Sequence, residues 1–591
     1  MARLIEDYGM IGDGETAALV HRNGSIDWLC WPRFDSDACF AALLGTDEHG
    51  YWKIAPTDAY ESDRRYQSDT LILEAEHKTT GGIVRVVDFM PIRENGSVLI
   101  RIVTGIKGKV PLRNATNLKF DYGQMPPWIE IDGGMAVARV GPHVVCLRSP
   151  VELKRDGTVI TAEFDVREGD EFVFVLANGD YTHPPPNHID AHEALRKTQK
   201  YWRDWIGRFN KHTDWPDAVR RSLITLKAMI YRPSGGIVAA PTTSLPEAAG
   251  GDMNWDYRFS WVRDATFTLS ALINAGYHAE AGAWRDWLLR AVAGDPENMR
   301  IMYRVDGSRR LEEWIATWLP GFRWATPVRI GNAAAVQLQL DVYGELMDTA
   351  HLAAKAGIGK PTEHGLSVQD AIVRHVEAVW RMPDQGLWEA RGEPRHHVYS
   401  KASAWVVMDR YVSGPDIAAR IGKAEVARLS ALRDTMHEDI CREGYDQGLG
   451  TFVNYYGCQE LDASLLLLPL IGFLPANDER MAATIAAIER ELVEDGLVRR
   501  WRPDGSGTPE ATFLACTCWL AECQAMQGRH EAARKTFERL LSVQNDLGLL
   551  AEEYDTRAKC QAGNFPQALS HLALVQTAFS LCGPVMKRGS E

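Results

Sequence analysis

The hydrophobic pattern of the chain changes its period near residue 185, and this change limits the fold more than any other feature. Before it, short runs rich in β-branched and aromatic residues alternate with Gly and Asn turns, as in residues 17–31 and 97–106. Many short strands separated by such turns are typical of an antiparallel β-sandwich. The segment 182–187 then holds three consecutive prolines, which the interiors of strands and helices exclude. We therefore expect an N-terminal β-sandwich over residues 1–185.

After the prolines, apolar residues recur every three or four positions, which is the spacing of amphipathic helices. Residues 188–211 are mostly polar and predict one connecting helix, within a linker at 186–213. Twelve further helical segments follow in residues 214–591; Leu223, Leu226 and Ile230, for example, fall on one face. The segments begin near residues 215, 264, 278, 332, 366, 399, 422, 462, 478, 511, 529 and 566.

Twelve helices are too many for a simple bundle, and the economical closed arrangement is an (α/α)6 barrel in which inner and outer helices alternate. The links from odd to even segments are long, whereas the reverse links are mostly short. The long links are residues 234–263, 295–331, 383–398, 444–461, 496–510 and 546–565. In an up-and-down barrel they all emerge at one end. Because long loops on a rigid scaffold carry function, we expect the functional site on that face.

Composition excludes several classes of protein. The chain has 65 Lys and Arg against 79 Asp and Glu, a net charge of −14, which argues against nucleic acid and anionic membranes as partners. No apolar stretch approaches the roughly 20 residues of a membrane span, and the N-terminus lacks a signal-peptide pattern. Ten Cys residues without CxxC spacing indicate free thiols rather than a zinc site. We expect a cytoplasmic protein with no metal or cofactor; its oligomeric state stays open, a homo-oligomer included.

The long links carry aromatic and charged clusters. In Asn254–Asp264, Arg263 and Asp264 place hydrogen-bond donors beside acceptors, and sugar hydroxyls need both. Glu389 follows Trp388, and Glu552 follows an apolar run. Two carboxylic acids that face one cleft are what glycoside hydrolysis requires, and a neighbouring Trp raises the pKa of the acid by excluding water.

Several separated motifs, in order along essentially the whole chain, resemble one family. They are residues 5–9, 24–35, 261–264, 327–332, 387–389 and 551–554. The chain resembles glycoside hydrolase family 15, the glucoamylase, glucodextranase and trehalase family, in its bacterial and archaeal form. The first two motifs resemble its trehalase-like N-terminal domain. The resemblance implies a β-sandwich before an (α/α)6 barrel.

Carried over position by position, the resemblance implies that Glu389 is the general acid and that Glu552 is the general base that activates water. Such a pair inverts the anomeric carbon and lies roughly 6.5–9.5 Å apart. Glu553 is the neighbouring carboxylate that competes for the base position. The other residues with an implied role in substrate binding are Tyr257, Trp261, Arg263, Asp264, Trp324, Arg329, Trp388 and Arg391.

Four residues, Arg391, His396, His397 and Lys401, have weaker correspondences to the family. We interpret His396 and His397 as a hydrogen-bonded loop pair, because a third metal ligand at suitable spacing is missing. Lys401 is interpreted as an ion-pair partner rather than a nucleophile. Arg391 is expected to bind sugar or to pair with a catalytic carboxylate.

Our leading hypothesis is an inverting, exo-acting α-glucoside hydrolase that releases β-D-glucose from the non-reducing end of a small substrate, with trehalose favoured. Maltooligosaccharides or an α-1,6-linked glucoside are the alternatives within the family. A second enzyme hypothesis is an inverting disaccharide phosphorylase, in which phosphate replaces the activated water. The hypothesis from another class is a carbohydrate-binding protein without turnover.

Overall fold

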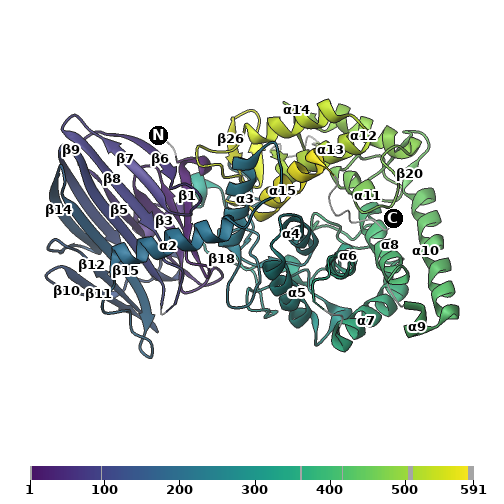
Figure 1. The fold of residues 1–591 in the computed structure, drawn as a ribbon, viewed down its shortest axis with the longest axis horizontal. Coiled ribbons are helices and arrows are strands. Elements are labelled where there is room, and N and C mark those ends of the chain that lie inside the picture. The colour runs from purple at the N-terminus through teal and green to yellow at the C-terminus, as the bar shows by residue number, and fades with distance from the viewer. Residues whose placement is uncertain (1–2, 95, 360–361, 415–416, 503–509, 584–591) are drawn as a thin grey trace.

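The computed structural model describes residues 3–94, 96–359, 362–414, 417–502 and 510–583. Figure 1 shows the N-terminal strands at one end of the molecule and a ring of helices at the other, with helix α2 (Ala191–Ile206) lying along the strands and leading to the ring. This arrangement confirms the predicted order of a β-sandwich, a helix and an (α/α)6 barrel.

The N-terminal part consists of fifteen antiparallel strands in two connected layers. The strands are β1 (Tyr8–Gly12), β2 (Ala17–His21), β3 (Ser25–Cys30), β4 (Ala38–Phe40), β5 (Tyr51–Pro56), β6 (Glu61–Tyr66), β7 (Leu73–Lys78), β8 (Gly82–Phe89), β9 (Val98–Asn117), β10 (Trp128–Asp132), β11 (Met135–Val140), β12 (His143–Arg148), β13 (Lys154–Asp156), β14 (Val159–Arg167) and β15 (Glu171–Asp180).

Strand β9 belongs to both layers. Its first half pairs with β8 and β15, and its second half pairs with β5 and β14. The sequence predicts a strand only as far as residue 106, because Gly108 resembles a turn residue. Gly108 does have a positive φ of 68°, but the chain continues there into the second layer instead of turning back. One long strand therefore joins the two sheets.

A buried ion pair ties the layers together beside β9. Arg101 and Asp88 are both buried, and Arg101 donates to Asp88 through Nε (2.8 Å) and Nη2 (3.0 Å). Its Nη1 and Nη2 also donate to the carbonyl oxygens of Trp52 (2.9 Å) and Gly24 (2.8 Å), which belong to the other layer. A buried charge is tolerated only when it is paired and hydrogen-bonded, as this guanidinium is.

Twelve helical segments form the barrel, and their first residues fall close to the predicted ones. The helices of the chain are α1 (Phe120–Gly123), α2, α3 (Pro216–Met229), α4 (Arg263–Asn274), α5 (His278–Val292), α6 (Asp341–Lys355), α7 (Glu363–Val379), α8 (Val398–Val412), α9 (Ile417–Ile421), α10 (Lys423–Glu443), α11 (Leu467–Leu470, after the 3-10 turn Ala463–Leu466), α12 (Glu479–Glu491), α13 (Leu514–Met526), α14 (His530–Leu541) and α15 (Ala568–Cys582). The segment expected near residue 332 starts with a 3-10 turn (Ala333–Val336), and its α-helix begins at Asp341.

The inner helices close into a ring. α4 contacts α6, α6 contacts α8, α8 contacts α11, α11 contacts α13, α13 contacts α15, and α15 contacts α4 again. Helices α3, α5, α7, α10, α12 and α14 pack outside this ring. Composition explains the division: α13 is apolar around most of its circumference and almost wholly buried, whereas α14 buries only Ala533, Phe537 and Leu540.

The links from outer to inner helices are long, as predicted, and several carry short strands. These are β16 (Ser260–Trp261), β17 (Met302–Tyr303), β18 (Trp314–Ile315), β19 (Arg329–Ile330), β20 (Tyr445–Asp446), β21 (Thr451–Phe452), β22 (Val493–Glu494), β23 (Leu497–Val498), β24 (Thr512–Phe513), β25 (Glu553–Asp555) and β26 (Cys560–Ala562). Residues 503–509 of the link between α12 and α13 lie outside the described residues.

The sandwich packs against these links, and one continuous apolar core extends through both parts. Trp28 donates its indole N–H to the carbonyl oxygen of Pro241 (2.8 Å), and Trp318 donates to that of Tyr122 (3.1 Å). Asn545, in the link between α14 and α15, donates to the carbonyl oxygen of Tyr8 (3.0 Å). The links are therefore held by the sandwich as well as by the helices.

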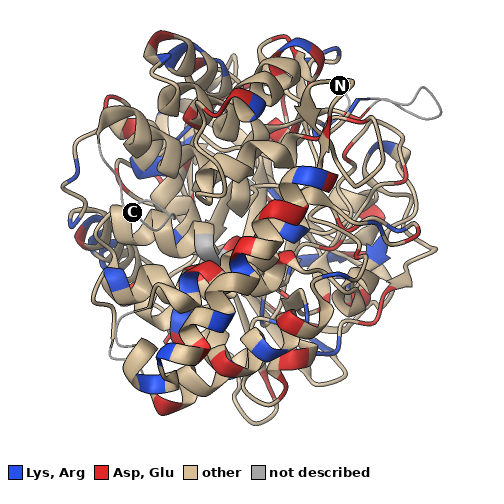
Figure 2. Cartoon of the chain, turned by 90° about the vertical axis from the view of Figure 1, so that its right-hand side faces the viewer, with Lys and Arg blue, Asp and Glu red and all other residues tan. Residues whose placement is uncertain are grey.

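The charged surface, the helices and the cysteines can be compared with what the composition predicts. Figure 2 shows that basic and acidic residues are mixed over the barrel face that it draws. Among the described residues, the helices contain no segment with the length and apolar character of a membrane span. All ten cysteines are free, as predicted.

We expect Arg101→Met to destabilise the sandwich strongly, because it leaves the Asp88 carboxylate buried without its partner. Breaking a buried pair costs about 3–5 kcal/mol, which lowers the midpoint of thermal unfolding by roughly 6–20 °C. The matched control is Arg65→Met, since Arg65 is 56% exposed and pairs with Glu74 at 2.9 Å. Its midpoint should move by less than about 2 °C. Equal shifts in differential scanning calorimetry would contradict a structural role for the buried pair.

Candidate active site

A cavity of about 830 Å³ lies on the barrel face where the long links gather. Its wall comes from the links at 230–262, 380–397, 444–462, 492–513 and 542–567, and from the inner helices α4, α13 and α15. The link at 293–340 contributes none of the described lining residues. Six residues predicted from the sequence lie in this wall: Tyr257, Arg263, Trp388, Glu389, Arg391 and Glu552.

Glu389 lies in a tight turn between α7 and α8. Its φ is +58°, a conformation that residues other than Gly rarely adopt and that packing must enforce. Its Oε1 accepts hydrogen bonds from Nε1 of Trp261 (2.6 Å) and Nη1 of Arg263 (3.2 Å). Burial raises the pKa of Glu389, and the Arg263 charge and the Trp261 hydrogen bond oppose that rise. A carboxylic acid with a raised pKa can remain protonated and serve as a proton donor.

Arg263 and Asp264 begin helix α4 and form a pair. Nε of Arg263 donates to Oδ1 of Asp264 (3.1 Å), and Nη1 also donates to the carbonyl oxygen of Leu387 (2.9 Å). Arg263 lines the cavity, whereas Asp264 is buried beside it. Oδ2 of Asp264 has no hydrogen-bond partner within the described part of the chain. A donor and an acceptor of this kind, side by side, suit the hydroxyls of a sugar.

Glu552 lies in the cavity wall just before strand β25 and is buried. Its Oε1 accepts a hydrogen bond from Oη of Tyr257 (2.6 Å), and its Oε2 has no partner among the described residues. A Cβ on Gly563 would lie 2.7 Å from Oε2, so the absent side chain leaves room for the carboxylate. Burial and then the Glu247 charge raise the pKa of Glu552 to about 8.

Two aromatic rings connect the carboxylates. The rings of Tyr257 and Trp261 pack edge to face, with centroids 5.3 Å apart. Tyr257 hydrogen-bonds to Glu552, and Trp261 hydrogen-bonds to Glu389. Each carboxylate therefore uses one oxygen to hold its place against this ring pair. The two acids sit in different environments within one cavity, which is the arrangement that separates acid and base roles.

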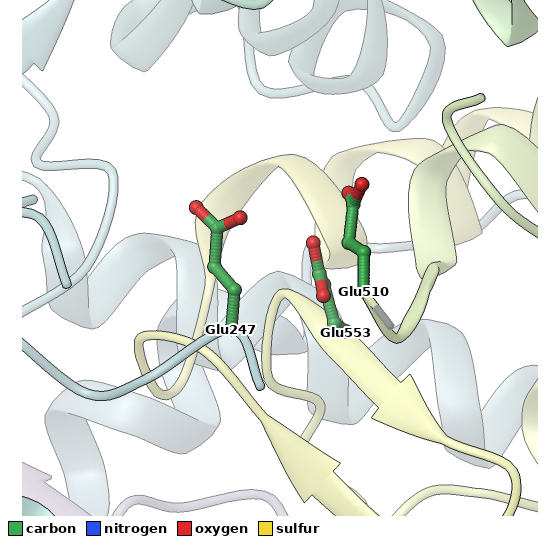
Figure 3. Close-up of side chains that lie close together, drawn as sticks. All are labelled: Glu247, Glu510 and Glu553. Atoms are coloured by element: carbon green, nitrogen blue, oxygen red, sulfur yellow. The ribbon is translucent and has the colours of Figure 1, made fainter. Parts of the chain in front are cut away.

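Three more glutamates gather around one arginine. Figure 3 shows Glu247, Glu510 and Glu553 close together, from three different links; one oxygen of each lies within 4.8 Å of the others. Arg500 donates to Glu247 and Glu510, and its Nη2 lies 3.1 Å from Oε1 of Glu553. Carboxylates at this spacing could share a cation, and here the guanidinium takes that position. Glu553 is buried outside the cavity wall, so its carboxylate faces Arg500 rather than the cavity.

Trp388 anchors the wall next to Glu389. Its Nε1 lies within hydrogen-bond distance of both carboxylate oxygens of Asp462 (2.9 and 3.0 Å). Its ring packs against Phe513 (5.2 Å between centroids) and Trp519 (6.0 Å). Arg500 lies 5.5 Å from the centroid of the Trp388 ring, so the aromatic wall also supports the charge cluster.

Five of the eleven expected site residues are not among the described residues that line the cavity, namely Trp261, Asp264, Trp324, Arg329 and Glu553. Trp324 is 76% exposed; it ends a 3-10 turn whose Phe322 is buried, and the preceding Gly321 hydrogen-bonds to the carbonyl oxygen of Leu44 in the sandwich. The structure therefore does not place Trp324 in the cavity beside Glu389. Arg329 braces the wall from behind, since its Nη1 donates to the carbonyl oxygen of Asp252 (2.6 Å).

Three of the residues with weaker correspondences, His396, His397 and Lys401, also have defined partners. His397 lines the cavity and shares a hydrogen bond with Asn454 (3.0 Å), and His396 stacks on Tyr456. Lys401 does not pair with a carboxylate as expected. Its Nζ donates to the carbonyl oxygens of Trp380 (2.7 Å) and Met382, which follow the end of helix α7.

Sequence reasoning missed part of the wall, namely Glu247, Trp255, Asp462, Arg500 and Glu510. All five lie on long links. Loop length therefore predicted the part of the chain that contains them, but not which residues line the cavity. Trp255 adjoins the aromatic cluster already singled out. Nothing in the sequence indicated that Glu247, Arg500 and Glu510, more than 250 residues apart at the extremes, would meet.

Both the N-terminal and the C-terminal part of the chain match models of known protein families. The family model described as glycosyl hydrolases family 15 matches residues 215–579, and the model described as trehalase-like, N-terminal matches residues 1–202. A trehalase of Thermoplasma volcanium is 35% identical, covering 99% of this chain and 95% of its own. A trehalase of Mycobacterium tuberculosis is 36% identical, covering 97% of this chain and 88% of its own.

The fold has a solved counterpart. A bacterial glucoamylase complexed with acarbose superposes with a TM-score of 0.74 over 98% of this chain and 94% of its own, at 14% identity. The resemblance inferred from the sequence motifs is thus confirmed at the level of family and fold. The chain belongs to glycosyl hydrolases family 15.

Proposed function

We propose that the protein is an inverting, exo-acting α-glucoside hydrolase whose substrate is trehalose. One observation carries the chemistry: two carboxylates with different hydrogen-bond environments, Glu389 and Glu552, line a single cavity. The choice of trehalose is supported by full-length relatives that are named trehalases. A cytoplasmic location and the domain limits 1–185, 186–213 and 214–591 belong to the same proposal.

In the proposed reaction Glu389 donates its proton to the glycosidic oxygen as the bond from that oxygen to the anomeric carbon breaks. Water attacks the same carbon from the opposite face, and Glu552 accepts the proton that this water loses. Oε2 of Glu552, which has no partner among the described residues, is the oxygen available to that water. The products are β-glucose from the glycosyl part and a second glucose as the leaving group. Proton exchange with solvent then restores both carboxyls.

Arg263 and Asp264 account for action at a chain end. In the proposal they bind hydroxyls of the terminal glucose, so the sugar that enters the cavity must have no further unit attached at those positions. The guanidinium is held by Asp264, Leu387 and Glu389. Because Arg263 also contacts the acid, binding the terminal glucose and positioning the proton donor depend on one side chain.

The proposal predicts the anomer that appears first. Purified protein incubated with trehalose should release β-glucose and α-glucose in equal initial amounts, the β-anomer from the attacked sugar and the α-anomer from the leaving sugar. Maltose, isomaltose and kojibiose test the alternative linkages. Proton NMR in the first minutes follows the anomers before mutarotation. Initial α-glucose alone would exclude inversion, and phosphate-dependent release of a sugar phosphate would favour phosphorolysis.

Replacing the proposed base should separate it from its neighbour. Glu552→Gln should lower kcat on trehalose by about 10²- to 10⁴-fold, which is the contribution of a positioned general base. Glu553→Gln changes a carboxylate that faces Arg500, and we expect a loss below about tenfold because that residue takes no part in proton transfer. Thermal unfolding shows whether each variant is folded. Full hydrolysis by Glu552→Gln without an added nucleophile would refute the mechanism.

The Glu247 charge should influence the pH profile. Glu552 acts only when it is ionised, so activity falls as the pH drops below its pKa, which burial and the Glu247 charge raise to about 8. Glu247→Gln removes that charge and lowers the pKa of Glu552. The ratio of kcat/KM at pH 5 to kcat/KM at pH 8 should therefore be higher in the variant than in the wild type. Glu531→Gln, on the exposed side of α14, is the control. A lower ratio would contradict the assigned base.

A further inference from the structure

The cavity wall carries an aromatic side chain with two guanidinium groups close to its ring. Trp255 lines the cavity, and the guanidinium carbons of Arg329 and Arg391 lie 4.4 and 4.5 Å from its ring centroid. Arg329 is tied down by the carbonyl oxygens of Asp252 (2.6 Å) and Asn254 (3.2 Å). Cations over an aromatic face attract it electrostatically, so the indole is fixed in orientation.

The Arg391 guanidinium is hydrogen-bonded through one of its nitrogen atoms, Nη2. Its Nη2 donates to Oε2 of Glu313 (3.1 Å) and to Oδ1 of Asn332 (3.2 Å). Glu313 also lies 3.6 Å from Arg329, so one carboxylate supports both guanidinium groups. Within the described part of the chain, Nη1 and Nε of Arg391 make no hydrogen bond, and its side chain is 35% exposed. Arg391 is among the residues that line the cavity.

The position of Trp255 and Arg391 relative to Glu389 determines which part of a substrate they contact. Arg391 follows Glu389 by two residues, and its charge counters the rise that burial produces in the pKa of Glu389. The acid protonates the oxygen of the leaving group, so the leaving group lies on the acid's side of the bond that breaks. Arg263 and Asp264, in contrast, belong to helix α4 deeper in the barrel.

We propose that Trp255 and Arg391 form the binding site for the leaving glucose unit, with the indole as a platform and the free guanidinium donors bound to its hydroxyls. This inference rests on the proposed function. Glu313, Asn332 and Arg329 act as positioning residues, because they hold the platform and line none of the described cavity. The link at 293–340 thus affects substrate choice from behind the wall.

The chemistry of the two groups fits a sugar better than an apolar leaving group. An aromatic face packs against the C–H surface of a pyranose, while a guanidinium offers several donors in a fixed plane to neighbouring hydroxyls. An apolar leaving group would leave the Nη1 and Nε donors without partners, which costs binding energy. The site should therefore distinguish a glucosyl leaving group from a methyl group.

Binding in the absence of chemistry tests this assignment directly. In a Glu389→Gln background, trehalose and methyl α-D-glucopyranoside are titrated by calorimetry into protein with and without Trp255→Ala or Arg391→Met. The Kd for trehalose should rise at least about tenfold, the loss expected for one hydrogen bond to a charged group. The Kd for the methyl glucoside, which has no sugar as leaving group, should change less than about twofold.

Kinetics with the intact acid gives the second readout. Trp255→Ala and Arg391→Met should lower kcat/KM for trehalose mainly through KM, and Trp255→Phe should restore most of it because the platform is retained. Arg395→Met is the matched control, since Arg395 lies on the same link over Tyr455 and outside the cavity wall. Equal losses for both ligands, or no loss for either, would overturn the assignment alone. Wild-type protein without activity on any α-glucoside would overturn the proposed function, and this inference with it.

Discussion

The site depends on one buried ion pair in the link between α3 and α4, at the point where this link contacts the sandwich. Arg258 donates to both carboxylate oxygens of Asp256 (2.9 and 2.6 Å), and it also donates to Oη of Tyr122 (2.9 Å) and the carbonyl oxygen of Ser36 (2.8 Å) in the sandwich. Asp256 in turn accepts from the backbone N–H of Gly331 (3.0 Å). Because the charges are buried and paired, removing either partner leaves the other uncompensated. The pair therefore holds two long links against the N-terminal strands.

This anchoring explains how the wall is built. Successive side chains of an extended segment point to opposite sides. Between Trp255 and Arg258 the segment alternates accordingly, since Trp255 and Tyr257 line the cavity while Asp256 and Arg258 are buried on the other side. Tyr257 then positions Glu552, and three residues later β16 brings Trp261 to Glu389. A contact with the sandwich thus sets the positions of Glu389, Glu552 and Trp255, which are the proposed acid, base and platform.

The structural features that could be predicted from the sequence are those that depend on residues close together in the chain. The change of period near residue 185 and the spacing of apolar residues located the sandwich and twelve helical segments, because burial of one face repeats along a helix. Residues in family motifs, such as Glu389 and Glu552, were located by position in those motifs. Strand β9 was predicted too short, and Trp324, expected near Glu389, is not among the residues that line the cavity. Both differences come from non-local contacts, since the second half of β9 is defined by β5 and β14 and the turn at Trp324 by the sandwich.

The charge cluster around Arg500, of which Glu247, Glu510 and Arg500 line the cavity, affects how strong a base Glu552 is near neutral pH. An ordinary glutamate is a weak base there, and a base works best when its pKa lies near the working pH. Four carboxylates, those of Glu247, Glu510, Glu552 and Glu553, lie near Arg500. Burial, together with neighbouring carboxylate charges that one guanidinium cannot balance, raises the pKa of Glu510, Glu552 and Glu553. In the proposed mechanism this raised pKa makes Glu552 a stronger proton acceptor once it is ionised, so the excess of acid groups serves the proposed reaction rather than opposing it.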